Sequence, residues 1–194
     1  MMTWVAKAIG VLVVAAAIAI GSAWAVLRHY PLQTDIANGS WRTSLAVGST
    51  SADLYTRARV ALTGLFALNP SEAIYFSANV DNAGRTLRTH CTYVIDGKPF
   101  VAQWWSITAY ADDNFLIPNP ANRFSFNMGN LPIGTDGRYR IVASSAEQTG
   151  NWLPTGTGGR GLILTLRLYN ASPEILRQLS SIELPSIKLA GSCP

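Results

Sequence analysis

Charged residues are scarce in this chain: Asp, Glu, Lys and Arg make up only 13% of its 194 residues. Its 15 Lys and Arg are scattered, without the basic run or stripe that tracks a nucleic-acid backbone. Setting aside Lys7 and Arg28, which flank an apolar segment, leaves 13 basic residues against 11 acidic ones. We therefore expect no nucleic-acid partner, and the surplus of Gly, Pro, Ser, Thr and Asn favours a turn-rich β domain.

Motifs for nucleophilic, metal or phosphate chemistry are also missing. There is no Gly-x-Ser-x-Gly elbow, and the chain holds only two histidines, His29 and His90. The glycine-rich residues 156–161 lack Gly-Lys-Ser/Thr and precede a predicted strand, so they indicate a hairpin loop. We therefore predict no catalytic residue, no metal site and no cofactor.

An acidic pair offers the main alternative to that prediction. Asp112 and Asp113 stand beside Asn114 in a predicted turn, where turn chemistry alone accounts for such residues. The alternative is an envelope hydrolase that acts on an ester or a glycan, with a site among Asp112, Asp113, His90 and Arg167.

One long apolar run dominates the N-terminal part of the chain. It begins at Ala8, ends at Leu27 and contains no charge, which is the length that a helix needs to cross a bilayer. Lys7 on its N-terminal side favours a cytoplasmic N-terminus. A signal peptide cleaved near Ala23 and Ala25 remains open, although the run is long for one. Both alternatives place residues 29–194 outside the cytoplasm.

Two cysteines, Cys91 and Cys193, follow the apolar run. An oxidising compartment favours a disulfide between them. A zinc site with His90 lacks the paired ligand spacing of such sites. The bridge would tie the C-terminus to a central strand.

The chain divides into residues 1–28 as a transmembrane anchor or signal peptide, 29–50 as a juxtamembrane linker and 51–194 as an ectodomain. In the linker, the residues around Trp41 could dock an extended strand on the domain. Residues 51–68 predict one soluble helix, which Thr50 or Ser51 can cap. Its apolar residues fall on one stripe: Leu54, Ala58, Ala61, Leu62, Leu65 and Phe66.

Beyond residue 73 the apolar period changes to two, which predicts strands. The expected strands cover residues 74–80, 87–95, 103–110, 138–143 and 162–169, with a turn at 81–84 and a short helix at 173–179. Leu162, Leu164, Leu166 and Leu168 form the clearest face. Short strands separated by Gly and Pro turns predict a mainly β fold, an antiparallel sandwich of the jelly-roll type.

Short motifs then follow one another in a distinctive order: residues 104–110 (WWSITAY), 116–119 (LIPN), 122–125 (NRFS), 151–154 (NWLP), 166–169 (LRLY) and 173–174 (PE). Over about residues 70–190 this set resembles domain-of-unknown-function family 1214, and residues 54–58 look like the helix of its short, membrane-anchored bacterial members. The resemblance implies a jelly-roll-like β-sandwich in the envelope of a Gram-negative bacterium. Many family members carry a second β domain on the N-terminal side, where this chain has an anchor. The family supplies no catalytic residues.

A set of aromatic and arginine residues provides the candidate binding site. A wide aromatic such as Trp152, in a predicted loop beside Asn151, suits stacking on a sugar or a partner. Arg167 lies on the less apolar face of its strand and needs polar partners if buried. A purely structural role in packing is the alternative for all of them. The candidates are Trp104, Tyr110, Phe115, Arg123, Asn151, Trp152 and Arg167.

These observations favour a non-catalytic ectodomain anchored in the bacterial inner membrane by one helix, with its C-terminal domain in the periplasm. Its partner is expected to be another membrane protein or a glycan. Gly10, Gly21 and the alanines at 15–17 would allow close packing of the anchor on another helix.

Overall fold

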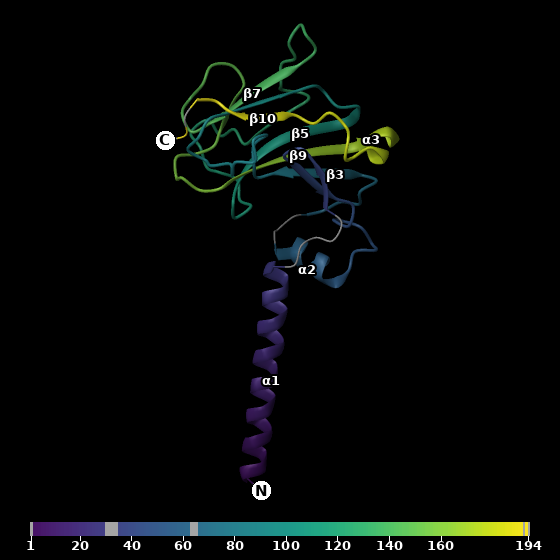
Figure 1. Ribbon diagram of the computed structural model, residues 1–194, viewed down its shortest axis with the longest axis vertical. Helices are drawn as coiled ribbons and strands as arrows, with labels where there is room; N and C mark the ends of the chain where they lie inside the picture. The colour runs from purple at the N-terminus through teal and green to yellow at the C-terminus, as the bar shows by residue number, and fades with distance from the viewer. Residues whose placement is uncertain (1, 30–34, 63–65, 192, 194) are drawn as a thin grey trace.

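The computed structural model describes residues 2–29, 35–62, 66–191 and 193, and shows one long helix that projects from a β-rich body (Figure 1). The elements in chain order are α1 (Met2–His29), β1 (Asp35–Asn38), β2 (Trp41–Ser44), α2 (Leu54–Leu62), β3 (Ala73–Ala78), β4 (Tyr93–Gly97), β5 (Ala102–Ala111), β6 (Ser125–Asn127), β7 (Tyr139–Ser144), β8 (Trp152–Pro154), β9 (Leu162–Ala171), α3 (Pro173–Arg177) and β10 (Ser186–Leu189).

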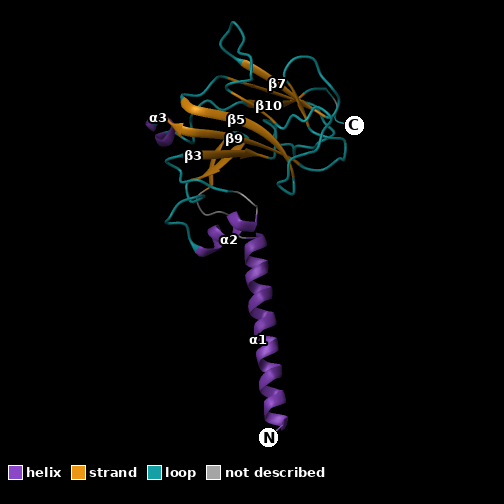
Figure 2. Cartoon of the chain, turned by 180° about the vertical axis from the view of Figure 1, so that it is seen from behind, coloured by secondary structure: helices purple, strands orange, loops and turns teal. Residues whose placement is uncertain are grey.

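Helix α1 contains the predicted apolar run and extends it at both ends. Its side chains are almost all exposed, and the segment Thr3–His29 is long and apolar enough to cross a membrane. An exposed apolar helix of this length at the N-terminus is compatible with a membrane span or a signal anchor. Figure 2 shows that it stands clear of the sheets and meets the body near α2.

The body consists of two sheets, which confirms the prediction of a mainly β fold. The larger sheet has the order β1-β2-β3-β9-β5-β6 and is antiparallel throughout; the smaller has the order β10-β4-β7-β8. In the smaller sheet β7 and β8 run parallel and the other pairs are antiparallel. The apolar side chains of both sheets form one common core.

Strand β9 lies at the centre of the larger sheet, between β3 and β5. Its predicted leucine face is confirmed, because all four leucines from Leu162 to Leu168 are fully buried. The alternate residues Ile163, Arg167 and Tyr169 are only partly buried and lie on the opposite face of the sheet. Alternation along a ten-residue strand thus separates the core from a polar and aromatic outer face.

The segment assigned to the juxtamembrane linker contributes a β-hairpin to the larger sheet. Strands β1 and β2 pair with each other, and Arg42 of β2 pairs with Ser77 of β3. Trp41 is fully buried and its indole N–H donates to the Pro185 carbonyl at 2.7 Å. The extended strand expected around Trp41 is therefore present as β2, and it packs on the domain.

The predicted strand over residues 87–95 is correct only in its second half. The face formed by Leu87, Thr89 and Cys91 is buried as expected, but β4 begins at Tyr93. Before it, the backbone N–H of Thr89 donates to the Arg160 carbonyl, and that of Cys91 turns back to Arg88. Because these N–H groups bond to a loop and a turn instead of to a neighbouring strand, β4 begins later than predicted.

Helix α2 is shorter than predicted, and its cap is a different residue. The Asp53 carboxylate, instead of Thr50 or Ser51, accepts from the backbone N–H groups of Tyr55 and Thr56 at 2.9 and 3.1 Å. The hydrogen bonds from Thr56 lower the pKa of Asp53. Phe66, at the end of the predicted helix, lies outside α2, and the predicted stripe residue Leu65 lies outside the described residues.

The predicted disulfide joins Cys91 to Cys193 across a sequence separation of 102. It lies beside β10, which pairs along the edge of the smaller sheet with β4. The predicted turn at 81–84 is also confirmed, since the Asp81 carbonyl accepts from the N–H of Gly84. Helix α3 begins as expected, with Pro173 after the capping residue Ser172.

Candidate functional site

The structure divides the candidate binding residues between two places, apart from Phe115, which is exposed in the loop after β5. Trp104, Tyr110 and Arg167 share the outer face of the larger sheet, on β5 and β9. Trp152 lies on β8 of the smaller sheet, with Asn151 just before it, and Arg123 joins it from the loop between β5 and β6. The sequence grouped these residues by type, whereas the fold makes two separate surfaces of them.

Arg167 is half-buried near the middle of the outer face. Its guanidinium donates to the Tyr110 hydroxyl at 2.7 Å and to the Thr108 hydroxyl at 3.1 Å. It also lies 5.4 Å from the centre of the Tyr110 ring, in the range of a cation–π contact. Among the residues that the structure describes, Arg167 forms no ion pair with a carboxylate. Hydroxyls and a ring therefore hold the cation in place on the sheet.

Trp104 lies further along the same face, opposite Tyr169 of the neighbouring strand. The two rings meet edge to face with their centres 5.3 Å apart. Trp104 keeps 38% of its surface exposed, so it packs on the sheet without being covered. This part of the outer face is therefore aromatic and partly open to solvent.

Trp152 lines a recess with a volume of about 470 Å³. Its indole N–H donates to the Ser144 carbonyl at 2.9 Å, which fixes the ring in one orientation. A volume of this size is in the range of small-molecule sites. Besides Trp152, the lining comprises Pro118, Asn119, Pro120, Ser145, Glu147, Pro154, Gly156 and Thr157.

Hydrogen bonds from two predicted residues support this recess. The Arg123 guanidinium donates to the Trp152 carbonyl at 3.0 Å and lies over the Phe126 ring. The Asn151 amide donates to the Arg140 carbonyl at 2.9 Å. Both side chains thus bond to backbone, and their role is to hold β8 and its indole in position.

Part of the lining of the recess, Pro118 to Pro120, comes from a loop that the sequence did not indicate as a site. The Asn119 side chain accepts from the backbone N–H of Arg123 and donates to its carbonyl, which closes the loop into a compact turn. Pro118 and Pro120 stiffen it on either side. The only sequence signal was the LIPN motif, which carried the family resemblance without indicating a role.

Within the described residues, the hydrogen bonds of Arg167 go to Tyr110 and Thr108, and no hydrogen bond or ion pair joins it to Asp112, Asp113 or His90. Arg160 pairs with Asp112 at 3.0 Å and with Asp113 at 2.5 Å. The hydrogen bond from Arg160 lowers the pKa of Asp113, which favours the ionised carboxylate and is the opposite of what a general acid needs. His90 lies instead beside the disulfide, with its Nε2 3.5 Å from the Cys193 sulfur.

His90, Cys91 and Cys193 bring three potential metal-ligand atoms within 4.8 Å of one another. Both sulfurs are used in the disulfide, however, so neither is a thiolate that could bind a metal. In this oxidised form, the cluster is a disulfide bond with a histidine beside it.

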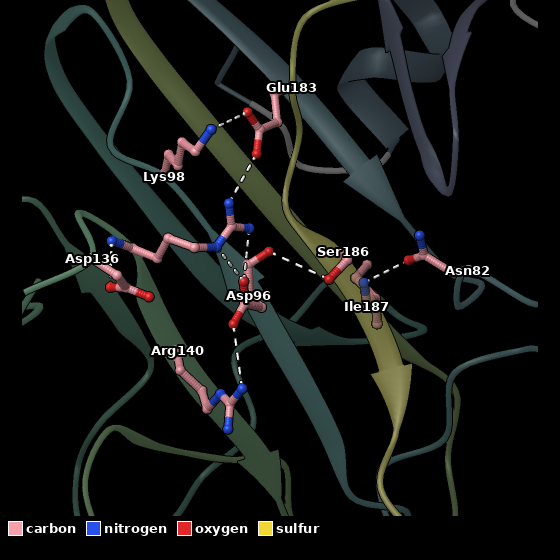
Figure 3. Close-up of polar contacts among 9 residues, drawn as sticks. Asn82, Asp96, Lys98, Asp136, Arg140, Glu183, Ser186 and Ile187 are labelled. Atoms are coloured by element: carbon pink, nitrogen blue, oxygen red, sulfur yellow. Dashed lines mark hydrogen bonds and ion pairs between the residues drawn. The ribbon is translucent and has the colours of Figure 1, made fainter. Parts of the chain in front are cut away.

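An ion-pair network covers the outer face of the smaller sheet (Figure 3). Arg138 bonds to Asp96 at 2.7 Å and to Glu183 at 3.1 Å, and Lys98 also pairs with Glu183 at 2.8 Å. The hydrogen bond from Lys98 lowers the pKa of Glu183 most, and the hydrogen bond from Arg138 lowers it further. The network links β4, β7 and the segment before β10, and its charges are already paired with one another.

Three comparisons place these features among known proteins. The model of the family described as "Protein of unknown function (DUF1214)" matches residues 72–173. The VPA0106 protein of Vibrio parahaemolyticus has a similar crystal structure, with a TM-score of 0.59 and 28% identity over 73% of this chain and 36% of that one. A putative uncharacterized protein from Burkholderia cenocepacia matches with a TM-score of 0.47 and 17% identity over 87% of this chain and 39% of that one. The chain spans less than half the length of either structure, and no curated protein matches it.

Proposed function

The chain belongs to the DUF1214 family of proteins of unknown function, and we propose that it is a single-pass protein of the bacterial inner membrane with a periplasmic, jelly-roll-like ectodomain. In this proposal the ectodomain binds an envelope glycan and catalyses no reaction itself. The recess at Trp152 is the observation that carries it.

The anchor and its direction are supported by α1 and the disulfide. Helix α1 is exposed along its length and apolar, which suits lipid as its surroundings. The Cys91–Cys193 disulfide persists in an oxidising compartment and is rare in the cytosol. Together they favour a body outside the cytoplasm, with α1 in the inner membrane.

A glycan fits the chemistry of the recess. The indole of Trp152 and the rings of Pro118 and Pro120 offer flat apolar surface, on which the C–H face of a sugar can pack. Glu147 and Thr157 at the rim supply an acceptor carboxylate and a hydroxyl for sugar hydroxyls. Few polar groups around a mostly apolar cleft is the usual composition of a small-molecule site.

The test is calorimetric titration of the full-length protein in mild detergent with a soluble muropeptide and with a lipopolysaccharide core oligosaccharide. Glu147→Ala and Trp152→Ala should each weaken binding at least 10-fold, the first without a change in thermal midpoint. Trp104→Ala is the matched control, because this exposed tryptophan lies outside the recess. No binding by the unaltered protein, or an equal loss in the Trp104→Ala variant, would refute the proposal.

Another membrane protein is the second candidate partner. At Gly10 and Gly21 of α1, an added Cβ would meet no atom within 4 Å, so a second helix has room to approach. Purification of the intact protein from native membranes, followed by mass spectrometry, tests this partner. A stoichiometric companion that is lost with Gly10→Leu would favour it over the glycan.

A further inference from the structure

The apolar stripe of α2 faces outward instead of toward the core. Leu54 and Leu62 keep 81% and 61% of their surface exposed, and Phe66, just beyond the helix, keeps 93%. The side of α2 that turns inward carries Thr56, which is buried. An amphipathic helix in a soluble domain normally buries its apolar stripe, so this arrangement needs an apolar partner outside the fold.

Helix α2 lies at the point where α1 meets the body (Figures 1 and 2). One recess is lined by Trp24, Leu27 and Arg28 of α1 together with Arg59 and Leu62 of α2. Asp113 and Asn114 of the loop after β5 complete it, and the next residue, Phe115, is 72% exposed. The exposed Leu62 of α2 and this loop therefore lie beside the C-terminal end of α1, and Phe66 follows Leu62 by four residues.

The tryptophans of α1 give the depth of this region. Trp4 and Trp24 are twenty residues apart, which is about 30 Å along a helix and matches the thickness of the hydrocarbon layer. Tryptophan is enriched at both membrane interfaces, so Trp24 marks the interface on the side of the body. Because Trp24 and Leu62 line the same recess, α2 lies at the level of the lipid headgroups.

We propose that α2 and Phe66 lie in the headgroup region of the bilayer that α1 crosses, with their apolar side chains among the upper acyl chains. Arg28 and Arg59 stand at the same level, where cations meet lipid phosphates. The inference rests on the membrane anchoring proposed above. Its consequence is a second contact with the lipid, which fixes the tilt of the body relative to the membrane.

The experiment places single cysteines in the full-length chain, because the two native cysteines are joined in a disulfide and do not react with a maleimide. Leu62→Cys and Phe66→Cys are labelled with an environment-sensitive fluorophore and reconstituted in phosphatidylethanolamine–phosphatidylglycerol vesicles. Val101→Cys is the matched control. Val101 is also an exposed apolar residue, and its backbone carbonyl accepts from the N–H of Ser172 at the start of α3. Val14→Cys, in the middle of α1, reports the anchor itself.

Lipids with a nitroxide near the headgroup should quench the labels at 62 and 66 at least 2-fold, while aqueous iodide should quench only the label at 101. Labels at 62 and 66 that behave like the label at 101 would overturn the inference. If the label at 14 is then quenched by a mid-chain nitroxide, the anchor stands without the second contact. If it is not quenched, the proposed anchoring fails as well. Unchanged near-UV circular dichroism confirms that each variant is folded.

Discussion

Removing the carboxylate of Asp81 should destabilise the body more than any other change of a single charge. Asp81 is fully buried, and it accepts hydrogen bonds from the backbone N–H groups of Ala83 and Arg85, both at 2.9 Å. Two nitrogens of the Arg85 guanidinium also bond to the Asp81 carboxylate, at 2.7 and 2.8 Å. Asp81→Ala would leave the backbone N–H groups of Ala83 and Arg85 without this acceptor and the Arg85 cation without its counter-charge.

The expected magnitude follows from these contacts. A hydrogen bond to a charged group contributes about 1.5–3 kcal/mol, and breaking a buried ion pair from one side costs about 3–5 kcal/mol. Arg85 is largely exposed and remains hydrated, so the cost of breaking a buried pair does not apply in full, and about 2–3 kcal/mol is the expectation for Asp81→Ala. Asp81→Asn keeps one acceptor oxygen and should cost about half as much.

The turn also joins the two sheets, which makes the effect global. The neighbouring Asn82 accepts from the backbone N–H of Ile187 in β10 at 2.6 Å and donates its own N–H to the Ile187 carbonyl at 2.9 Å (Figure 3). Loss of the Asp81 turn would therefore loosen β10 from the larger sheet. Urea unfolding of the full-length protein in detergent, followed by tryptophan fluorescence, measures the free energy of unfolding.

The pH dependence gives an independent check. Burial alone would raise the pKa of Asp81, but the hydrogen bonds and charge of Arg85 and the Ala83 N–H lower it overall. A lowered pKa in the folded state means that the carboxylate stabilises the fold above its unfolded pKa of about 3.9 and that this contribution is lost as the pH falls further. The difference between Asp81→Asn and the unaltered protein should therefore shrink below about pH 4.

Asp136→Asn is the matched control, since Asp136 accepts from a backbone N–H in a similar turn but is exposed. Its cost should stay below about 0.5 kcal/mol. A cost of Asp81→Ala below about 1 kcal/mol, or a difference that persists unchanged at pH 3, would refute the reasoning.

Three further predictions concern stability. Cys91→Ser together with Cys193→Ser should lower the free energy of unfolding by up to about 4.7 kcal/mol, because the bridge closes a loop of about 100 residues, and a reductant should have no effect on the double variant. Leu164→Ala, in the core, should cost about 2–5 kcal/mol in urea unfolding, whereas Ile163→Ala on the half-exposed face should cost much less; equal costs would contradict the assigned faces. Tyr139→Phe should leave stability unchanged or raise it, because the buried Tyr139 hydroxyl has no hydrogen-bond partner within the described residues; a loss above about 1 kcal/mol would point to a bound water.

Sequence patterns predicted the elements in which periodicity lasts longest. Strands β5 and β9 each span ten residues; the leucines of β9 alternate with less buried residues, whereas residues 105–109 of β5 are all buried. Strands β6 and β8 have three residues each, too few for any period, and Trp152 was accordingly assigned to a loop. Of the N-terminal hairpin, the sequence predicted only one extended strand around Trp41, because β1 and β2 are short and partly polar.

The candidate site could be predicted only in part, for a physical reason. Trp152 was recognisable as a wide aromatic among polar residues, but its recess also needs Pro118 and Asn119, more than thirty positions earlier. Nothing local in the sequence indicates which loop meets which strand. The stripe of α2 is a different case: the pattern identified the apolar face, but periodicity alone does not distinguish a protein core from lipid as its partner.

The position of β9 between β3 and β5 also determines when the body can fold. Phe76 of β3 pairs with Leu166 of β9, 90 residues later in the chain. Strand β4 likewise pairs with β10, which lies near the C-terminus. Pairings this distant in sequence form slowly, because the entropy of closing the loop is lost before any contact between the strands stabilises them. A chain that emerges N-terminus first therefore keeps the apolar edges of β3 and β5 open to aggregation until residue 171 has been released.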